Sequence, residues 1–108
     1  MLMNNSFDTI CHEHLEYYSL KQIEHILSQA QLRVVDLKFN DINGGSMRVY
    51  ATHDNSTLQS NGELINSVRE SEITLGLCES DIYNKFKMDC IEVSSSIKKF
   101  LEQASRRK

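Results

Sequence analysis

The sequence has no proline, no long apolar run and no basic stripe. A chain without proline suits regular helices and strands joined by glycine and asparagine turns. A membrane span would need about 18 consecutive apolar residues, and the apolar runs here are only a few residues long. The 12 basic and 15 acidic residues give a net charge of -3, without the concentrated positive charge of nucleic-acid-binding proteins. We therefore expect neither a membrane nor a nucleic acid among the partners.

The chain has three cysteines, Cys11, Cys78 and Cys90. Their odd number and wide spacing fit neither a disulfide framework nor paired zinc ligands, so we expect reduced thiols and no metal. Residues 1–3 carry no basic side chain and precede the polar residues 4–6, which is not the pattern of a secretory signal. The sequence thus predicts a cytoplasmic protein, with 40% hydrophobic and 25% charged residues as in ordinary globular domains.

The first half of the chain predicts a helix and two strands. Ser19 followed by Gln22 is a capping-box pattern, and apolar residues at helical spacing then predict a helix over residues 20–31. Two runs of alternating apolar residues predict half-buried strands: Val35, Leu37 and Phe39, then Met47, Val49 and Ala51. Between these runs, Asn43-Gly44-Gly45 supplies residues that accept positive φ, which predicts that the two strands form an antiparallel hairpin.

The second half predicts two helices. Residues 54–62 are polar and read as a linker, and a short helix closed by Gly76 follows. Ser80 can cap a long helix that runs to about residue 105. The fold class is therefore α+β: helix, antiparallel β-hairpin, then two helices. The long helix carries a continuous apolar stripe made of Ile82, Phe86, Cys90, Val93, Ile97, Leu101 and Ala104. This stripe could pack within the fold or pair helices between chains.

His12, Glu13 and His14 form the densest cluster of titratable side chains, in a segment without clean periodicity that reads as a loop or extended chain. Histidine exchanges protons near neutral pH, and a neighbouring carboxylate can orient its imidazole. A metal site is the rival interpretation, but two histidines supply only two ligands and no third lies at a diagnostic distance. Solvated polar residues would also fit, so the cluster alone decides nothing.

Two stretches of the sequence, taken together, indicate a protein family more specifically than either does alone. FDTICHEHLEYYSL and, after a helix and a strand, INGGSMRVYATH resemble the sugar C-methyltransferases that use S-adenosylmethionine, whose corresponding stretches read FDTIYHEHxSYFSL and HGGSxRVY. The resemblance covers residues 7–53 in register. It implies that residues 1–53 are the C-terminal part of a Rossmann-like methyltransferase domain and that residues 54–62 are a linker. Residues 63–108 would then be a helical segment that leads toward a C-terminal domain absent here.

The resemblance also implies roles for individual residues. His14 would be the base that removes a proton next to the ketone of a nucleotide-linked sugar, a deoxysugar precursor. Glu13 would support its electrostatics, and His12 and Tyr17 would shape the sugar pocket. Cys11 and Asn43 stand where the family has Tyr and His.

The chain lacks what binds the cofactor in this family. Its four glycines, Gly44, Gly45, Gly62 and Gly76, form no G-x-G motif, so no cofactor-binding residue is assigned and the chain alone is expected not to bind S-adenosylmethionine. The sequence leaves open whether it is an enzyme. The preferred hypothesis is a partial or remnant C-methyltransferase that is inactive alone. The alternative is a non-catalytic helical module that self-associates or binds a protein. Because the apolar stripe and the strand edge lack partners, we expect a homo-oligomer.

Overall fold

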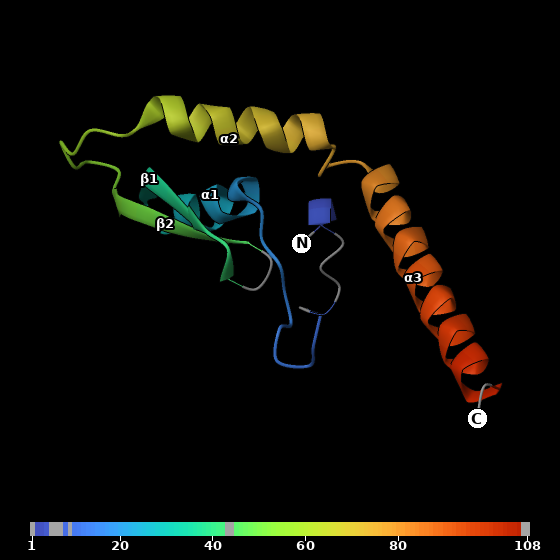
Figure 1. The fold of residues 1–108 in the computed structure, drawn as a ribbon. Coiled ribbons are helices and arrows are strands. Elements are labelled where there is room, and N and C mark those ends of the chain that lie inside the picture. Colours follow the sequence, from blue (N-terminus) through green and yellow to red (C-terminus); the bar gives the residue numbers. More distant parts are fainter. Residues whose placement is uncertain (1, 5–7, 9, 43–44, 107–108) are drawn as a thin grey trace.

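The computed structural model describes residues 2–4, 8, 10–42 and 45–106. It confirms the predicted α+β order of helix, antiparallel hairpin and two helices (Figure 1). The elements are a short 3-10 turn η1 (Leu2–Asn4), α1 (Leu20–Gln29), β1 (Leu32–Asn40), β2 (Ser46–His53), α2 (Gly62–Leu75) and α3 (Ser80–Arg106).

The predicted capping box begins α1. The side-chain oxygen of Gln22 accepts a hydrogen bond of 2.6 Å from the backbone N–H of Ser19, which satisfies a donor at the helix start. The helix ends at Ala30, and Gln31 follows with a φ of 56°. This left-handed conformation reverses the chain into β1 and is one that glycine adopts at lower cost.

The hairpin pairs Leu32 with His53 at its open end and Asn40 with Ser46 beside its turn, and a bulge interrupts the ladder at Val35. An extra residue in one strand shifts the alternation of side chains beyond it. The sequence analysis placed Val35 in phase with Leu37, and this was wrong: Val34 shares the face of Leu37 in the core. Val35 is also buried, and its carbonyl accepts a 2.7 Å hydrogen bond from the N–H of Asn61.

The core lies between α1, β1 and α2. Its buried members are Leu20, Val34, Leu37 and Ile65, and half-buried residues of α1, β2 and α2 pack around them. Phe39 was predicted to face the core but is 54% exposed, because β1 continues past the helices that cover its first half.

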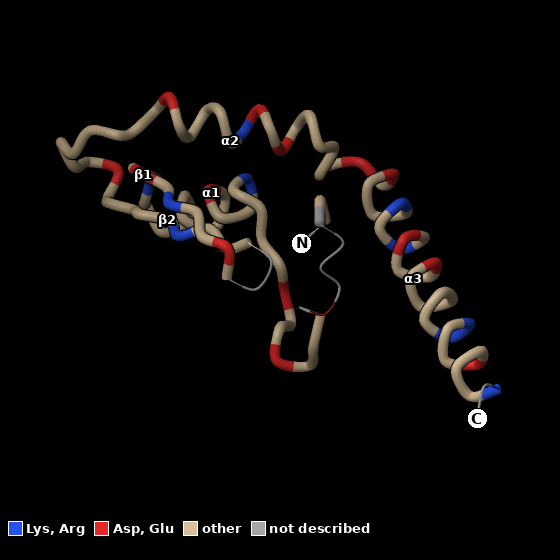
Figure 2. Tube along the Cα trace, in the orientation of Figure 1, with Lys and Arg blue, Asp and Glu red and all other residues tan. Residues whose placement is uncertain are grey.

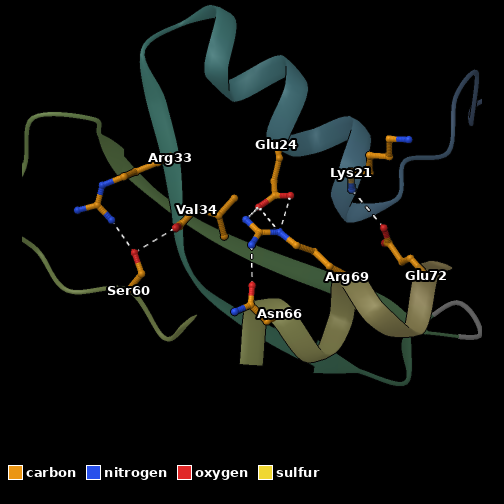
Figure 3. Close-up of polar contacts among 8 residues, drawn as sticks. All are labelled: Lys21, Glu24, Arg33, Val34, Ser60, Asn66, Arg69 and Glu72. Carbon is orange, nitrogen blue, oxygen red and sulfur yellow. Dashed lines mark hydrogen bonds and ion pairs between the residues drawn. The ribbon is translucent and has the colours of Figure 1, made fainter. Parts of the chain in front are cut away.

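The predicted linker lies against β1 rather than free in solvent. The guanidinium of Arg33 donates to the backbone carbonyls of Ser56 and Leu58, at 2.9 and 2.5 Å, and to the hydroxyl of Ser60 (Figure 3). The side-chain amide of Asn61 donates to Asp36 at 3.1 Å. These contacts fix where α2 starts.

The two C-terminal helices differ in their surroundings. α2 packs on β1 and α1, and Gly76, with a φ of 78°, ends it as predicted. α3 then turns away from the rest, so the molecule measures 68 × 25 × 23 Å (Figure 1). None of its described residues is buried. Within the described part of the chain, no helix has the length and apolar character needed to cross a membrane.

Candidate functional site

The cluster of His12, Glu13 and His14 lies in an exposed loop before α1, as predicted. The backbone N–H of His14 donates to the carbonyl of Cys11 at 3.1 Å. This bond closes a turn with His12 and Glu13 at its corners. The two histidines therefore belong to a turn and not to a straight extended segment.

The side chains of the loop form two local pairs. His12 Nε2 lies 3.8 Å from a carboxylate oxygen of Glu13, and the two side chains are 91% and 76% exposed. An ion pair so accessible to water contributes little energy. The rings of His14 and Tyr17 meet edge to face, with centroids 6.1 Å apart, an arrangement that aromatic pairs favour. The structure thus brings together His12 with Glu13 and His14 with Tyr17.

The topology brings this loop and the second motif to one end of the fold. β1 runs back beside α1, so its last residue, Asn40, and the first residue of β2, Ser46, lie toward the end where α1 begins (Figure 1). A helix of 10 residues spans about 15 Å and a strand of 9 residues about 30 Å. The hairpin therefore extends beyond α1 on the side from which the loop arrives. Its turn includes Gly45, with a φ of 116°, whereas Asn43 lies outside the described residues.

A carboxylate from α2 holds the start of α1, directly after the loop. Glu72 accepts hydrogen bonds from the backbone N–H groups of Leu20 and Lys21, at 2.5 and 3.2 Å (Figure 3). A negative charge is favourable at a helix N-terminus, where N–H groups lack partners within the helix. No local sequence signal could have revealed this contact, because 52 residues separate Glu72 from Leu20.

A second contact between α1 and α2 lies one turn further along. Arg69 binds the carboxylate of Glu24 through two of its nitrogens and also donates to Asn66 at 2.7 Å (Figure 3). Hydrogen bonding to Glu24 raises the pKa of the Arg69 guanidinium above its ordinary value. Together, Glu72 and Arg69 of α2 bind α1. These contacts fix the position of the N-terminus of α1, where the loop ends.

Metal ligands and free thiols are the other groups that could take part in chemistry. Among the described residues, no group of three or more His, Cys, Asp or Glu side chains gathers closely enough to hold a metal ion. Cys11, Cys78 and Cys90 are free, and the ammonium group of Lys21 lies 3.2 Å from the sulfur of Cys78. The histidines and tyrosines of the loop can exchange protons and donate hydrogen bonds.

Comparison with known proteins defines the class. A model of the family described as "C-methyltransferase C-terminal domain" matches residues 41–108. Because this match covers more than half of the chain, the chain belongs to that family. A curated relative, the protein named C-methyltransferase NovU from Streptomyces niveus, is 47% identical over 51 residues. That alignment covers 47% of this chain and 12% of the relative.

The match to the family begins in the hairpin connection, at residue 41. The sequence analysis placed a junction at residues 54–62 instead, and this division of the chain stays a prediction. In the described part of the chain the sheet is a two-stranded antiparallel hairpin, and Gly62 begins α2 while Gly76 follows its last residue.

Proposed function

We propose that this chain is part of an S-adenosylmethionine-dependent C-methyltransferase that acts on a nucleotide-linked keto sugar. The observation that carries the proposal is the topology, in which β1 runs back along α1, so that the hairpin residues Asn40 and Ser46 and the loop before Leu20 lie toward the same end of the fold (Figure 1). The family match and the NovU relative support the reaction class. The sugar class rests on the resemblance of the two motifs.

His14 would act as the general base. A carbon next to a ketone becomes a nucleophile only after it loses a proton, and imidazole is suited to accept that proton near neutral pH. The edge-to-face contact with Tyr17 would hold the ring while the sugar approaches from solvent. The methyl group would come from S-adenosylmethionine bound to a part of the enzyme that this chain does not contain.

The other loop residues would support this proton transfer. The carboxylate of Glu13 would favour the protonated imidazole that forms during the reaction. His12 and Tyr17 can both donate hydrogen bonds to the oxygens of a sugar. Their exposure would be reduced in a complete enzyme, where covering elements would exclude water and strengthen each interaction.

An exchange experiment tests the base. The loop and hairpin of this chain, residues 10–53, would replace the matching stretch of the Streptomyces niveus enzyme. The chimera is then incubated in D₂O with a nucleotide-linked keto sugar. We expect deuterium to enter the carbon next to the ketone, and His14→Gln to slow this exchange by about 100-fold or more. His25→Gln, which changes an exposed histidine of α1, is the matched control. Equal rates for both variants would contradict the role of His14.

A second test concerns this chain alone. We expect no heat of binding when S-adenosylmethionine is titrated into the protein, because its four glycines form no G-x-G motif of the kind that follows the first strand of a nucleotide-binding domain. Micromolar affinity would show a cofactor site of a different kind. Such an enzyme would work in the cytoplasm, where nucleotide-linked sugars are made.

A second function is favoured by a separate observation. The described residues of α3 leave Ile97, Phe100 and Leu101 more than half exposed. An exposed apolar surface of this kind typically marks an interaction site. The chain would then serve as a helical module that assembles with another protein chain, whether or not its loop takes part in catalysis.

A further inference from the structure

The apolar residues of α3 form a seam with the spacing of a coiled coil. Phe86, Cys90, Val93, Ile97, Phe100 and Ala104 follow one another at alternating intervals of four and three residues. This 3.5-residue repeat keeps side chains on one line along a helix that pairs with another helix. The seam uses Phe100 where the sequence analysis selected Leu101, which lies beside it.

The second half of the seam has no partner within the described chain, whereas Phe86 and Cys90 in its first half are half-buried. Phe100 is 69% exposed, Ile97 is 52% exposed, and α3 contacts mainly the short turn η1. Tyr83 extends the repeat by one position toward the N-terminus, where its hydroxyl donates to the carbonyl of Leu77 at 2.7 Å. The seam extends over about 30 Å of helix, and its second half, from Val93 onward, is open to another helix.

The charges of α3 favour one orientation of that helix. Its first half, residues 80–92, holds three acidic and two basic side chains, whereas residues 93–106 hold three basic and one acidic (Figure 2). Parallel pairing of two copies would place like halves together. Antiparallel pairing places each acidic half beside a basic half and also opposes the two helix dipoles.

We infer that α3 pairs with α3 of a second copy of this chain in an antiparallel coiled coil. The register that matches the seam sets Cys90 of each copy opposite Val93 of the other, and Phe86 opposite Ile97. Tyr83 then meets Phe100, so the small side chains fill the centre and aromatic pairs close both ends. This inference does not depend on the proposed catalytic role of the loop.

Two variants of α3 test the seam. Ile97 and Ile91 are both isoleucines of α3, and they are 52% and 48% exposed. Only Ile97 lies in the seam. Sedimentation and light scattering at high micromolar concentration should show a dimer for the unmodified chain. We expect Ile97→Glu to weaken dimerisation by about tenfold or more and Ile91→Glu to change it by about twofold or less.

The same measurements can overturn the inference. A monomer at high micromolar concentration would assign the seam to another segment or protein. A dimer that survives Ile97→Glu would place the interface elsewhere, for example on the free edge of β2. The methyl NMR signals of Val34 and Leu37 check that the core stays folded, because neither isoleucine belongs to the core cluster.

Cysteine crosslinking tests the orientation. One chain keeps only Cys90 (C11S/C78S), and a tagged second chain carries only the cysteine of Val93→Cys (C11S/C78S/C90A). After mixing and mild oxidation, the antiparallel register predicts that disulfides form mainly between the two different chains. Parallel helices would instead give disulfides between identical chains. A chain whose only cysteine is that of Ala104→Cys would then also crosslink to its own copies. Crosslinks mainly between identical chains would overturn the antiparallel arrangement.

Discussion

Leu20 in α1 and Leu101 in α3 both lie on the apolar side of an amphipathic helix, yet Leu20 is 0% exposed and Leu101 is 59% exposed. α1 is covered because β1 and α2 return to it within the same chain. α3 begins after Gly76 and turns away from these elements, and none of its described residues is buried. The comparison shows that an apolar helix face specifies that a partner is needed, while the topology decides whether the chain itself provides one.

The largest test of this contrast uses the two leucines. Leu20→Ala removes a fully buried side chain and should lower the free energy of unfolding by about 2 to 5 kcal/mol, which is enough to unfold much of so small a core. Leu101→Ala, in a monomeric sample kept dilute, should change it by about 0.5 kcal/mol or less. Urea denaturation followed by circular dichroism measures both. Similar losses for the two variants would contradict the division into a packed unit and a projecting helix.

A smaller effect is expected where α1 and α2 end. Gln31 and Gly76 both follow a helix with positive φ, at 56° and 78°, but only one of them is glycine. Gln31→Gly should stabilise the unit by about 1 kcal/mol, and Gly76→Ala should destabilise it by a similar amount. An added Cβ at Gly76 would meet no atom nearer than 3.9 Å, so the loss reports backbone conformation alone. Thermal melts of the two variants should move in opposite directions.

The smallest effect concerns the ion pairs. The side chains of Glu24 and Arg69 are 25% and 48% exposed, so solvent screens much of their attraction. A double-mutant cycle with Glu24→Gln and Arg69→Met should give a coupling of about 0.5 to 1 kcal/mol that falls as salt is added. The same cycle on Lys85 and Asp89, an i,i+4 pair within α3, should give about 0.3 to 0.5 kcal/mol. A larger coupling energy for Lys85–Asp89 than for Glu24–Arg69 would contradict the view that α3 is less covered than α1 and α2.

Local sequence signals predicted the elements well. The capping box at Ser19 and Gln22 gave the start of α1, and Gly76 gave the end of α2. The alternation in 46–53 and the glycine turn predicted the hairpin. Each of these signals acts over a few residues, which is why the order of elements could be read without the structure.

Contacts between distant segments could not be read in this way. The bulge at Val35 shifts the core face of β1, and its carbonyl is satisfied by Asn61 from the connection that follows β2. The position of the loop with His12 and His14 was predicted. The turn in this loop depends on the carbonyl of Cys11, and the start of α1 that follows it is held by Glu72. The roles of these loop residues in catalysis stay predictions.

The contact between Glu72 and the start of α1 also sets an order of events on the ribosome. The strands of the hairpin are neighbours in sequence, so they can pair as soon as His53 has left the exit tunnel. The first amides of α1 must wait for Glu72, which is made 52 residues after Leu20. Translation that stops between these points would release a hairpin whose α1 lacks the Glu72 carboxylate at its N-terminus. The start of α1, where the loop with His12 and His14 ends, therefore gains these hydrogen bonds only after α2 has been made.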